Sequence, residues 1–281
     1  MSDASVKRLE KVATDLRKII LKMIHQAGSG HPGGSLSAVD ILTVLYFHEM
    51  RIDPRNPEWK DRDRFILSKG HACPALYAVL AQRGFFPKEE LFSLRKINSK
   101  LQGHPDMITT PGVDMSTGSL GQGFSAAIGM ALGGKYLGKD FRVYVLLGDG
   151  ELDEGEVWEG AMCASHYGLD NLVAIIDYNG FQSDDYNTKI MNFEPLVEKW
   201  KAFGWYTIEI DGHNIKDIIG AFDRAKKLKG KPTVIVAHTI KGKGISFMEN
   251  NPKWHGSLAP DEIQLKTALC ELDRKELVLN G

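Results

Sequence analysis

Apolar residues recur along the first 28 residues at the spacing of an amphipathic helix. They occupy positions 6, 9, 12, 16, 19, 20, 23 and 24, and the pattern stops at Gly28. Residues three and four positions apart lie on one face of an α-helix. The chain is therefore predicted to begin with a helix that buries one apolar face and ends at this glycine.

Beyond this helix, short runs of β-branched and other apolar residues alternate with helical patterns. Strands that are buried on both faces of a parallel sheet read as continuous apolar runs. The alternation predicts an α/β fold in which helices cover both faces of a parallel β-sheet. We expect strands at 64–68, 142–148, 171–178, 206–210 and 233–238, and helices at 38–50, 74–84, 121–138, 158–168, 195–204 and 215–228.

Two stretches, 98–120 and 239–259, are rich in Gly, Pro, Asn and His and match neither pattern. Long irregular loops in a compact domain are commonly functional. The segment 121–138 is rich in small residues, which predicts a closely packed, buried helix. We expect residues 1–281 to form a single domain with a carboxyl-terminal helical extension from about residue 260.

Composition and charge exclude several classes of protein. The 281 residues are 43% hydrophobic and 25% charged, and 35 basic against 36 acidic side chains give a formal net charge of −1. This balance predicts no field that would gather nucleic acid or an anionic membrane surface. No apolar run approaches the ~20 residues that span a bilayer, and the charged amino terminus has no signal-peptide core. We therefore expect a cytoplasmic protein with neither nucleic-acid nor membrane partners.

Candidate chemistry lies where two expected strands end. The strand at 142–148 runs into Asp149 and Gly150, and the strand at 171–178 runs into Asn179. Ligands of open parallel sheets bind outside the carboxyl ends of the strands, where these side chains would be neighbours. Carboxylate and amide oxygens suit Mg²⁺ or Ca²⁺ that bridges to a diphosphate. Either residue alone could simply cap a turn, but the pair favours a metal–diphosphate site.

Other nucleotide-binding motifs do not match. No G-x-G-x-x-G follows an expected strand, which disfavours a dinucleotide-binding enzyme. Gly129, Gly134 and Lys135 match most of a P-loop. However, Tyr136 stands where Ser or Thr must hold Mg²⁺, and the stretch falls inside an expected helix.

A series of motifs resembles one enzyme family. SGHPGGSLS, LSKGHA, GHPD, TGSLGQG, GDGELDEG, DYNGFQSD, IKGKGI and WHG occur in the order seen in transketolases, over the chain from about residue 5 to about residue 260. The chain resembles the amino-terminal half of transketolase, the diphosphate-binding domain, present as a separate subunit. The resemblance implies a thiamin-diphosphate-binding fold with thiamin diphosphate and Mg²⁺ as cofactors, Ca²⁺ or Mn²⁺ being alternatives.

The resemblance also implies roles for individual residues. Asp149, Asn179 and the backbone carbonyl of Phe181 would hold the metal ion. The diphosphate would contact Gly150, His71 and His255. The other cofactor contacts that it implies are His31, Lys69, Gly118, Ser119, Leu120, Glu154, Gln182 and Lys241.

Three histidines would line the substrate channel in such an enzyme. The resemblance assigns this catalytic role to His31, His104 and His255, which would hydrogen-bond sugar hydroxyls and shuttle protons at the C2–C3 bond. Glu154 and Glu159 resemble acids of the subunit-contact and proton-relay region.

Several titratable residues have no role in this interpretation. Histidines outside the motifs are expected to be structural or solvated, and these are His25, His48, His166 and His213. His238 follows an expected buried strand and is left open. Glu151 and Asp153 are interpreted as first-turn acids that face a helix dipole.

The implied activity is transfer of a two-carbon glycolaldehyde unit from a ketose phosphate to an aldose phosphate. In the family, the glutamate that contacts the aminopyrimidine ring and most arginines that hold the sugar phosphate belong to a second, pyrimidine-binding domain. Because the sequence after WHG is short, we expect that domain to lie on another chain. We expect the chain to be inactive alone and active with a carboxyl-terminal transketolase subunit, in an α₂β₂ assembly that takes sugar phosphate substrates.

The motifs leave alternatives open. The chain could be a subunit of another thiamin diphosphate enzyme, either deoxyxylulose-phosphate synthase-like or 2-oxo acid dehydrogenase-like. It could also be a non-catalytic partner that binds thiamin diphosphate. The combination of GHPD, TGSLGQG and WHG favours transketolase, but the particular ketose phosphate is not encoded in these motifs.

Overall fold

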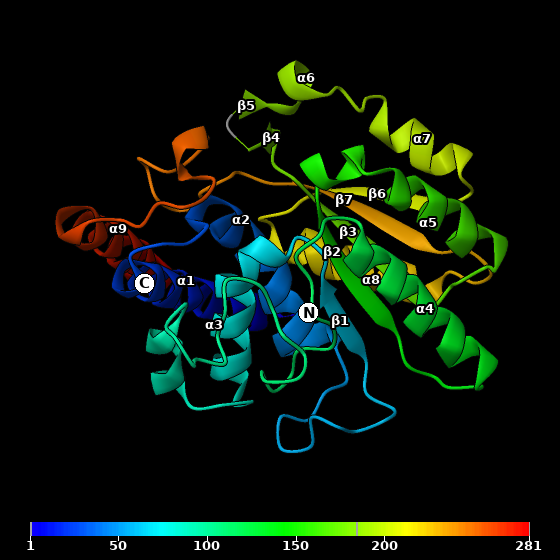
Figure 1. The fold of residues 1–281 in the computed structure, drawn as a ribbon, viewed down its shortest axis with the longest axis horizontal. Helices are drawn as coiled ribbons and strands as arrows, with labels where there is room; N and C mark the ends of the chain where they lie inside the picture. Colours follow the sequence, from blue (N-terminus) through cyan, green and yellow to red (C-terminus); the bar gives the residue numbers. More distant parts are fainter. Residues whose placement is uncertain (1, 184, 281) are drawn as a thin grey trace.

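A parallel β-sheet forms the centre of the molecule (Figure 1). The computed structural model describes residues 2–183 and 185–280. The strands of the sheet are β1 (Arg64–Leu67), β2 (Val143–Gly148), β3 (Leu172–Tyr178), β6 (Tyr206–Asp211) and β7 (Thr233–His238). Within the described residues they pair in the order β1-β2-β3-β7-β6, and every pairing is parallel. The α/β fold expected from the sequence is confirmed.

Helices cover both faces of the sheet, because successive strand residues point to opposite sides. The covering helices are α1 (Asp3–Ala27), α2 (Pro32–Val44), α3 (Cys73–Arg83), α4 (Gln122–Tyr136), α5 (Gly155–His166), α7 (Leu196–Ala202) and α8 (Ile215–Lys227). On β2, Tyr144 and Leu146 join a core with α1, α2, α3 and α8, whereas Val143 and Val145 join a second core with α4, α5 and α7. Figure 1 shows α4, α5 and α7 on one side of the sheet, away from α1, α2 and α3.

Two helices differ most from their expected bounds or surroundings. The helix expected at 38–50 begins earlier, at Pro32, because the fixed φ of proline suits a first helical turn. It closes in a π-helical turn at Leu45–Glu49. The helix expected at 121–138 buries one face only, and Tyr136 on the other face is 89% exposed. The expected burial of this helix therefore holds for one face of the helix only.

Short elements complete the chain. They are 3₁₀ turns at Gly70–Ala72, Lys88–Ser93, Gly150–Asp153 and Pro252–Trp254, an antiparallel pair of β4 (Phe181–Gln182) and β5 (Asp185–Tyr186), and α6 (Asn187–Ile190). The last helix, α9 (Glu262–Asn280), lies along α1, where Lys18 pairs with Asp273 and Glu276 at 2.6 Å each. In the part of the chain that the structure describes, no helix combines the length and apolar character needed to cross a membrane.

A buried ionic network joins segments on one side of the sheet. Arg17 of α1 is 1% exposed and donates to both carboxylate oxygens of Asp40 on α2, at 3.1 and 2.6 Å. His213, in the turn before α8, contacts the same carboxylate through Nδ1 at 2.7 Å, and its Nε2 accepts from the Ile240 N–H at 2.8 Å. Arg17 Nε also donates to the Lys243 carbonyl at 3.1 Å. The network thereby fixes the loop that follows β7.

Asp40→Asn is expected to lower the free energy of unfolding by about 3–5 kcal/mol, because it leaves the Arg17 guanidinium buried without a counter-charge. Burial alone would raise the pKa of Asp40, but Arg17 and His213 hold it well below its usual range. Urea denaturation at pH 7 measures the change. Asp3→Asn is the matched control, since Asp3 pairs with Lys216 at the surface, where ion pairs contribute little. Equal denaturation midpoints for the two variants would contradict the prediction.

Candidate functional site

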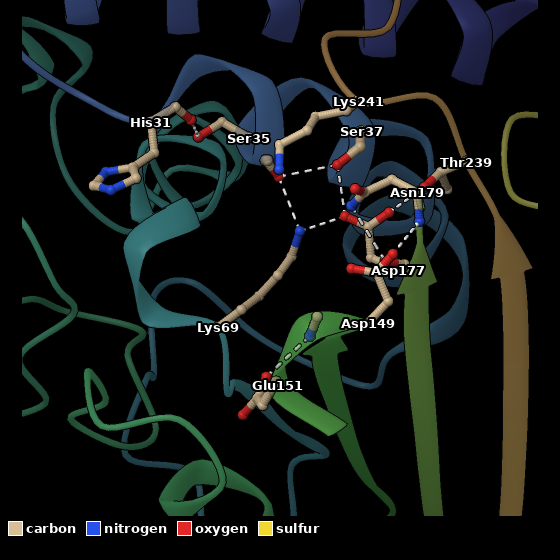
Figure 2. Close-up of polar contacts among 12 residues, drawn as sticks. His31, Ser35, Ser37, Lys69, Asp149, Glu151, Asp177, Asn179, Thr239 and Lys241 are labelled. Carbon is tan, nitrogen blue, oxygen red and sulfur yellow. Dashed lines mark hydrogen bonds and ion pairs between the residues drawn. The ribbon is translucent and has the colours of Figure 1, made fainter. Parts of the chain in front are cut away.

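A cavity of about 240 Å³ opens at the carboxyl edge of the sheet. Parallel sheets of this kind bind their ligands outside the carboxyl ends of the strands. Figure 2 shows side chains that project into this region from the segments after β1, β2, β3 and β7. The cavity is lined by His31, Gly34, Lys69, His71, Gly118, Leu120, Gly148, Asp149, Gly150, Glu151, Asn179, Phe181, Gln182, Ser183, Lys241 and His255.

Most residues that the sequence assigned to the site lie in this wall, and three do not. Ser119 and Glu154 are exposed and do not line the cavity. His104 is also exposed, but it lies next to the wall, because a Cβ built on Gly118 would lie 3.4 Å from His104 Cγ. These three residues lie outside the wall of the cavity in this structure.

Asp149 is buried at the turn after β2, with 2% of its surface exposed. Its carboxylate accepts hydrogen bonds from the backbone N–H groups of Gly150 at 2.9 Å, Asn179 at 2.9 Å and Gly180 at 2.6 Å. Burial, followed by the nearby charge of Asp177, raises the pKa of Asp149 to about 6. A buried carboxylate beside a second one is stabilised by a cation, so this position favours a metal ion.

Oxygen atoms at the end of β3 complete a candidate metal site. Figure 2 shows Asn179 and Asp149 projecting from the ends of neighbouring strands. Asn179 Oδ1 accepts from the Phe181 N–H at 3.2 Å, which orients the amide. A carboxylate, an amide oxygen and a backbone carbonyl fill about half of an octahedral Mg²⁺ shell and leave the other positions for non-protein oxygens. This donor set fits Mg²⁺ bound together with a diphosphate, and Ca²⁺ and Mn²⁺ use the same kind of ligand.

A buried ion pair lies beside the cavity. Lys69, just after β1, donates from Nζ to the carboxylate of Asp177 in β3 and, at 3.0 Å, to the Gly34 carbonyl. Asp177 is 0% exposed and also accepts from the hydroxyls of Ser37, at 2.5 Å, and Thr239. Burial raises the pKa of Asp177, but Lys69 and the two hydroxyls outweigh it and lower the pKa. The pair therefore stays charged and joins α2, β1, β3 and β7 (Figure 2).

Sequence reasoning gave no role to Asp177 or to Glu151. The sequence carried one signal for Asp177, because it is a charged residue at the end of an apolar strand. A charge that is buried in this way requires a partner. Glu151 is buried, and its carboxylate accepts from the N–H groups of Gly121 and Gly148 at 2.9 Å each and from the Ser68 hydroxyl. It therefore ties the loop before α4 to the ends of β1 and β2, whereas the sequence suggested only a first-turn acid.

Three histidines gather in the cavity wall. The ring centroids lie 5.1 Å apart for His31 and His71, 5.5 Å for His71 and His255, and 5.9 Å for His31 and His255. Burial and then Arg95 lower the pKa of His31 to about 4, and burial and then Lys241 lower the pKa of His255 to about 3. Burial also holds the pKa of His71 well below its usual range. The three rings are therefore neutral at pH 7 and offer N–H donors.

The wall combines oxygen ligands with cationic and neutral donors. Lys241 Nζ lies 3.4 Å from the Phe181 carbonyl and 2.7 Å from His255 Nδ1, so it links the candidate metal site to the histidines. A divalent cation held by Asp149 and Asn179 would bind an anionic ligand, and lysine and imidazole N–H groups would bind the same anion. The arrangement can therefore hold a metal-bound diphosphate.

Known proteins resemble the chain along nearly its whole length. Residues 9–277 match the family described as transketolase, thiamine diphosphate binding domain. The chain is 49% identical over 267 residues to the 6-deoxy-6-sulfo-D-fructose transketolase subunit SqwG of a Clostridium species, covering 95% of this chain and 97% of that protein. It is 41% identical over 270 residues to one of the subunits of the apulose-4-phosphate transketolase of Phocaeicola vulgatus, covering 96% and 95%. The match to mouse transketolase, 48% identical, covers 90% of this chain and 40% of that protein.

Solved transketolase structures share the fold. The complex of Pichia stipitis transketolase with sedoheptulose 7-phosphate superposes with a TM-score of 0.88 at 30% sequence identity, covering 98% of this chain and 46% of that one. Transketolase from Campylobacter jejuni gives a TM-score of 0.86 at 32% identity, covering 100% of this chain and 48% of that one. The chain belongs to the transketolase family, and it corresponds to the thiamine diphosphate-binding domain of that family.

Proposed function

We propose that the chain is the amino-terminal subunit of a two-subunit transketolase that acts in the cytoplasm. In this proposal, residues 1–281 form one cofactor-binding domain with α9 as an extension. The enzyme transfers a two-carbon glycolaldehyde unit from a ketose phosphate, or a ketose with a similar terminal anion, to an aldose phosphate. The observation that carries the proposal is the pairing of Asp149 and Asn179 at the ends of adjacent strands, within one cavity with Lys241 and His255.

The chain would bind the diphosphate half of the cofactor. Asp149, Asn179 and the Phe181 carbonyl would hold Mg²⁺, and His71, His255 and Lys241 would contact the diphosphate oxygens. Thiamin diphosphate, when bound, supplies the carbon nucleophile that attacks the ketose carbonyl and permits cleavage of the C2–C3 bond. The Lys69–Asp177 pair keeps the wall in place, so the donors are oriented before the ligand arrives.

The histidines would act on the sugar. Because the pKa values of His31 and His255 are about 4 and about 3, both rings are neutral donors at pH 7. Neutral imidazole N–H groups can hydrogen-bond the sugar hydroxyls and the oxygen on which charge develops during C–C cleavage. His104, beside Gly118, would reach the same substrate from the exposed side of the wall.

The proposed substrate is a ketose with a terminal anionic group. Two relatives that match the chain over nearly their full lengths are named for 6-deoxy-6-sulfo-D-fructose and for apulose 4-phosphate. Both names describe a ketose that carries a sulfonate or a phosphate at one end. This chemistry supports a ketose phosphate, or its sulfonate analogue, as donor for this chain.

A carboxyl-terminal partner subunit is part of the proposal. The two relatives of similar length are named as transketolase subunits, whereas the chain spans about 40% of the mouse enzyme. Apolar side chains are exposed shortly after residues of the site, where a partner that completes the cavity would bind. They are Met107 and Ile108 after His104, Tyr186, Ile190 and Met191 after Gln182, and Leu258 after His255. An α₂β₂ assembly would place each cavity between subunits.

Calorimetric titration with thiamin diphosphate plus Mg²⁺ is expected to show binding that EDTA abolishes. Asp149→Ala should weaken this binding by at least about 100-fold, because it removes a carboxylate that would ligate the metal directly. The titration is made with the chain alone and with the carboxyl-terminal subunit present, since the partner supplies the other half of the cofactor site. Asp153→Ala, four residues further on and outside the cavity wall, is the matched control and should bind normally. Equal affinity for the Asp149 and Asp153 variants would refute the proposed metal site.

The chain alone should not turn over xylulose 5-phosphate with ribose 5-phosphate, and addition of the carboxyl-terminal subunit should produce activity. Light scattering after size exclusion should then give the mass of an α₂β₂ assembly. Ile108→Asp should weaken the assembly about tenfold or more, because it places a charge in the proposed apolar contact. Leu277→Asp, at another strongly exposed apolar position, on α9, should leave assembly unchanged.

If the isolated chain turned over xylulose 5-phosphate, the proposal that activity requires a partner subunit would be wrong. Turnover of pyruvate by the assembled complex would instead favour a different thiamin diphosphate enzyme. Parallel assays with 6-deoxy-6-sulfofructose and apulose 4-phosphate as donors would identify the ketose that the complex prefers.

A further inference from the structure

Arg95 is held beside the histidine cluster in an unusual backbone conformation. It lies in the irregular segment after the 3₁₀ turn at Lys88–Ser93, and its φ is +60°. Residues other than glycine rarely adopt this left-handed conformation, so surrounding contacts must fix it. One of them is the hydrogen bond from the Arg95 N–H to the Leu101 carbonyl at 2.8 Å.

The guanidinium of Arg95 bridges two residues in the segment just before α2. Its NH1 donates to Ser29 Oγ at 2.5 Å, and its NH2 lies 3.2 Å from His31 Nδ1. A Cβ built on Gly103 would lie 3.3 Å from Arg95 Nε, so the backbone of the loop packs closely against the guanidinium. These contacts hold the planar group in one orientation toward His31.

Hydrogen-bond chemistry then determines where the His31 proton lies. A guanidinium has only N–H donors, so the ring nitrogen that faces it must accept. A neutral imidazole with an accepting Nδ1 carries its proton on Nε2. We propose that Arg95 is a positioning residue that fixes His31 in the tautomer with the proton on Nε2, so that His31 offers a hydrogen-bond donor to the cavity.

A glycine packs closely against the imidazole ring of His31. A Cβ on Gly256 would lie 2.5 Å from His31 Nε2 and 2.4 Å from Cδ2, so a larger residue here would push the ring out of place. Gly256 therefore helps to hold the ring where Arg95 can reach its Nδ1. His31 also lines the cavity, so the ring is placed to contact a ligand there.

The hydrogen-bond partners divide four histidines of this chain into two groups. His255 resembles His31, because Lys241 Nζ, also a donor without acceptor capacity, lies 2.7 Å from its Nδ1. His25 and His213 show the opposite pattern. His25 Nδ1 lies 2.8 Å from the Pro260 carbonyl and so must donate, and His213 Nε2 accepts from the Ile240 N–H. His31 and His255 therefore carry the proton on Nε2, and His25 and His213 carry it on Nδ1.

This tautomer gives His31 a definite chemical role. The part of that role that concerns catalysis rests on the proposed function. With Nδ1 occupied by Arg95, the ring presents only its Nε2–H to a sugar hydroxyl or to the developing alkoxide oxygen. The low pKa of His31, about 4, agrees with a ring that donates a hydrogen bond without a positive charge. Arg95 would act on the reaction only through His31.

Long-range ¹H–¹⁵N correlation spectra of the ¹⁵N-histidine-labelled full chain at pH 7.5 test the tautomer directly. His31→Gln identifies the His31 signals by their loss. We expect His31 with an unprotonated Nδ1 and a protonated Nε2, and His25 and His213 with the reverse pattern as references in the same spectrum. A protonated Nδ1 in His31 of the unaltered chain would overturn the inference.

Two substitutions separate positioning from packing. Arg95→Met keeps much of the side-chain length without a donor, and it should convert His31 to a mixture of tautomers while His25 and His213 stay unchanged. Arg95→Lys keeps a cationic donor and should retain the Nε2–H form. If Arg95→Met does not fold, Ser29→Ala replaces it, since this variant only releases NH1 and should broaden or split the His31 signals. The His31 signals must change in at least one folded variant that removes the Arg95 guanidinium or the Ser29 hydroxyl. If they stay the same in every such variant, the proposed role of Arg95 is contradicted.

The assembled two-subunit enzyme supplies a second measurement. Arg95→Met should lower kcat by about 10- to 100-fold with a smaller change in KM, and Arg95→Lys should recover most of the loss. A structural defect would instead lower the amount of active enzyme without changing the tautomer of His31. If the spectra show the expected tautomers but the complex has no transketolase activity, the proposed function fails and the assignment of Arg95 to His31 stands.

Discussion

The buried contact between Lys69 and Asp177 is the interaction on which the cavity depends. Two opposite charges with almost no solvent exposure are stable only as a well-bonded pair, and removal of either leaves an uncompensated charge. Their contacts reach α2 through Ser37 and Gly34 and β7 through Thr239. Because these partners come from separate segments of the chain, the pair fixes how the elements meet at the carboxyl edge of the sheet.

The Lys69–Asp177 pair also determines which carboxylate near the cavity is left to bind a cation. Asp177 is neutralised by Lys69, and Glu151 is held by backbone N–H groups and a hydroxyl. Asp149 accepts hydrogen bonds from three backbone N–H groups, but burial and the nearby charge of Asp177 still raise its pKa to about 6. A divalent cation bound to Asp149 would stabilise the negative charge of this carboxylate. The proposed metal site therefore follows from the charge balance of its neighbours as much as from its own ligands.

The sequence predicted the parallel sheet and its helices because burial on both faces leaves continuous apolar runs. It also placed Asp149 and Asn179 at neighbouring strand ends, since β2 and β3 are adjacent in the sheet. It did not predict that 121–138 would bury only one face, because small residues signal close packing on either one side or all sides. The motif resemblance, and not periodicity, singled out His31 and His255. Contacts between distant segments could not be predicted from the sequence. Arg95 is an example, because it lies 64 residues from His31 along the chain and no local pattern predicts the backbone conformation of its loop.

The surroundings of the histidines show how one residue type serves two purposes in this fold. Nδ1 is engaged in His31, His255, His25 and His213, but its partner differs. A carbonyl or carboxylate on Nδ1 draws the proton there and leaves Nε2 to accept from the chain, as at His213. A cation on Nδ1 excludes the proton and moves it to Nε2, as at His31 and His255. Burial and then the cation lower the pKa, so the ring remains neutral while the cavity gains a donor. Placing Arg95 and Lys241 behind the histidines thus prepares the cavity for oxygen-rich, negatively charged ligands without adding imidazolium charges to its wall.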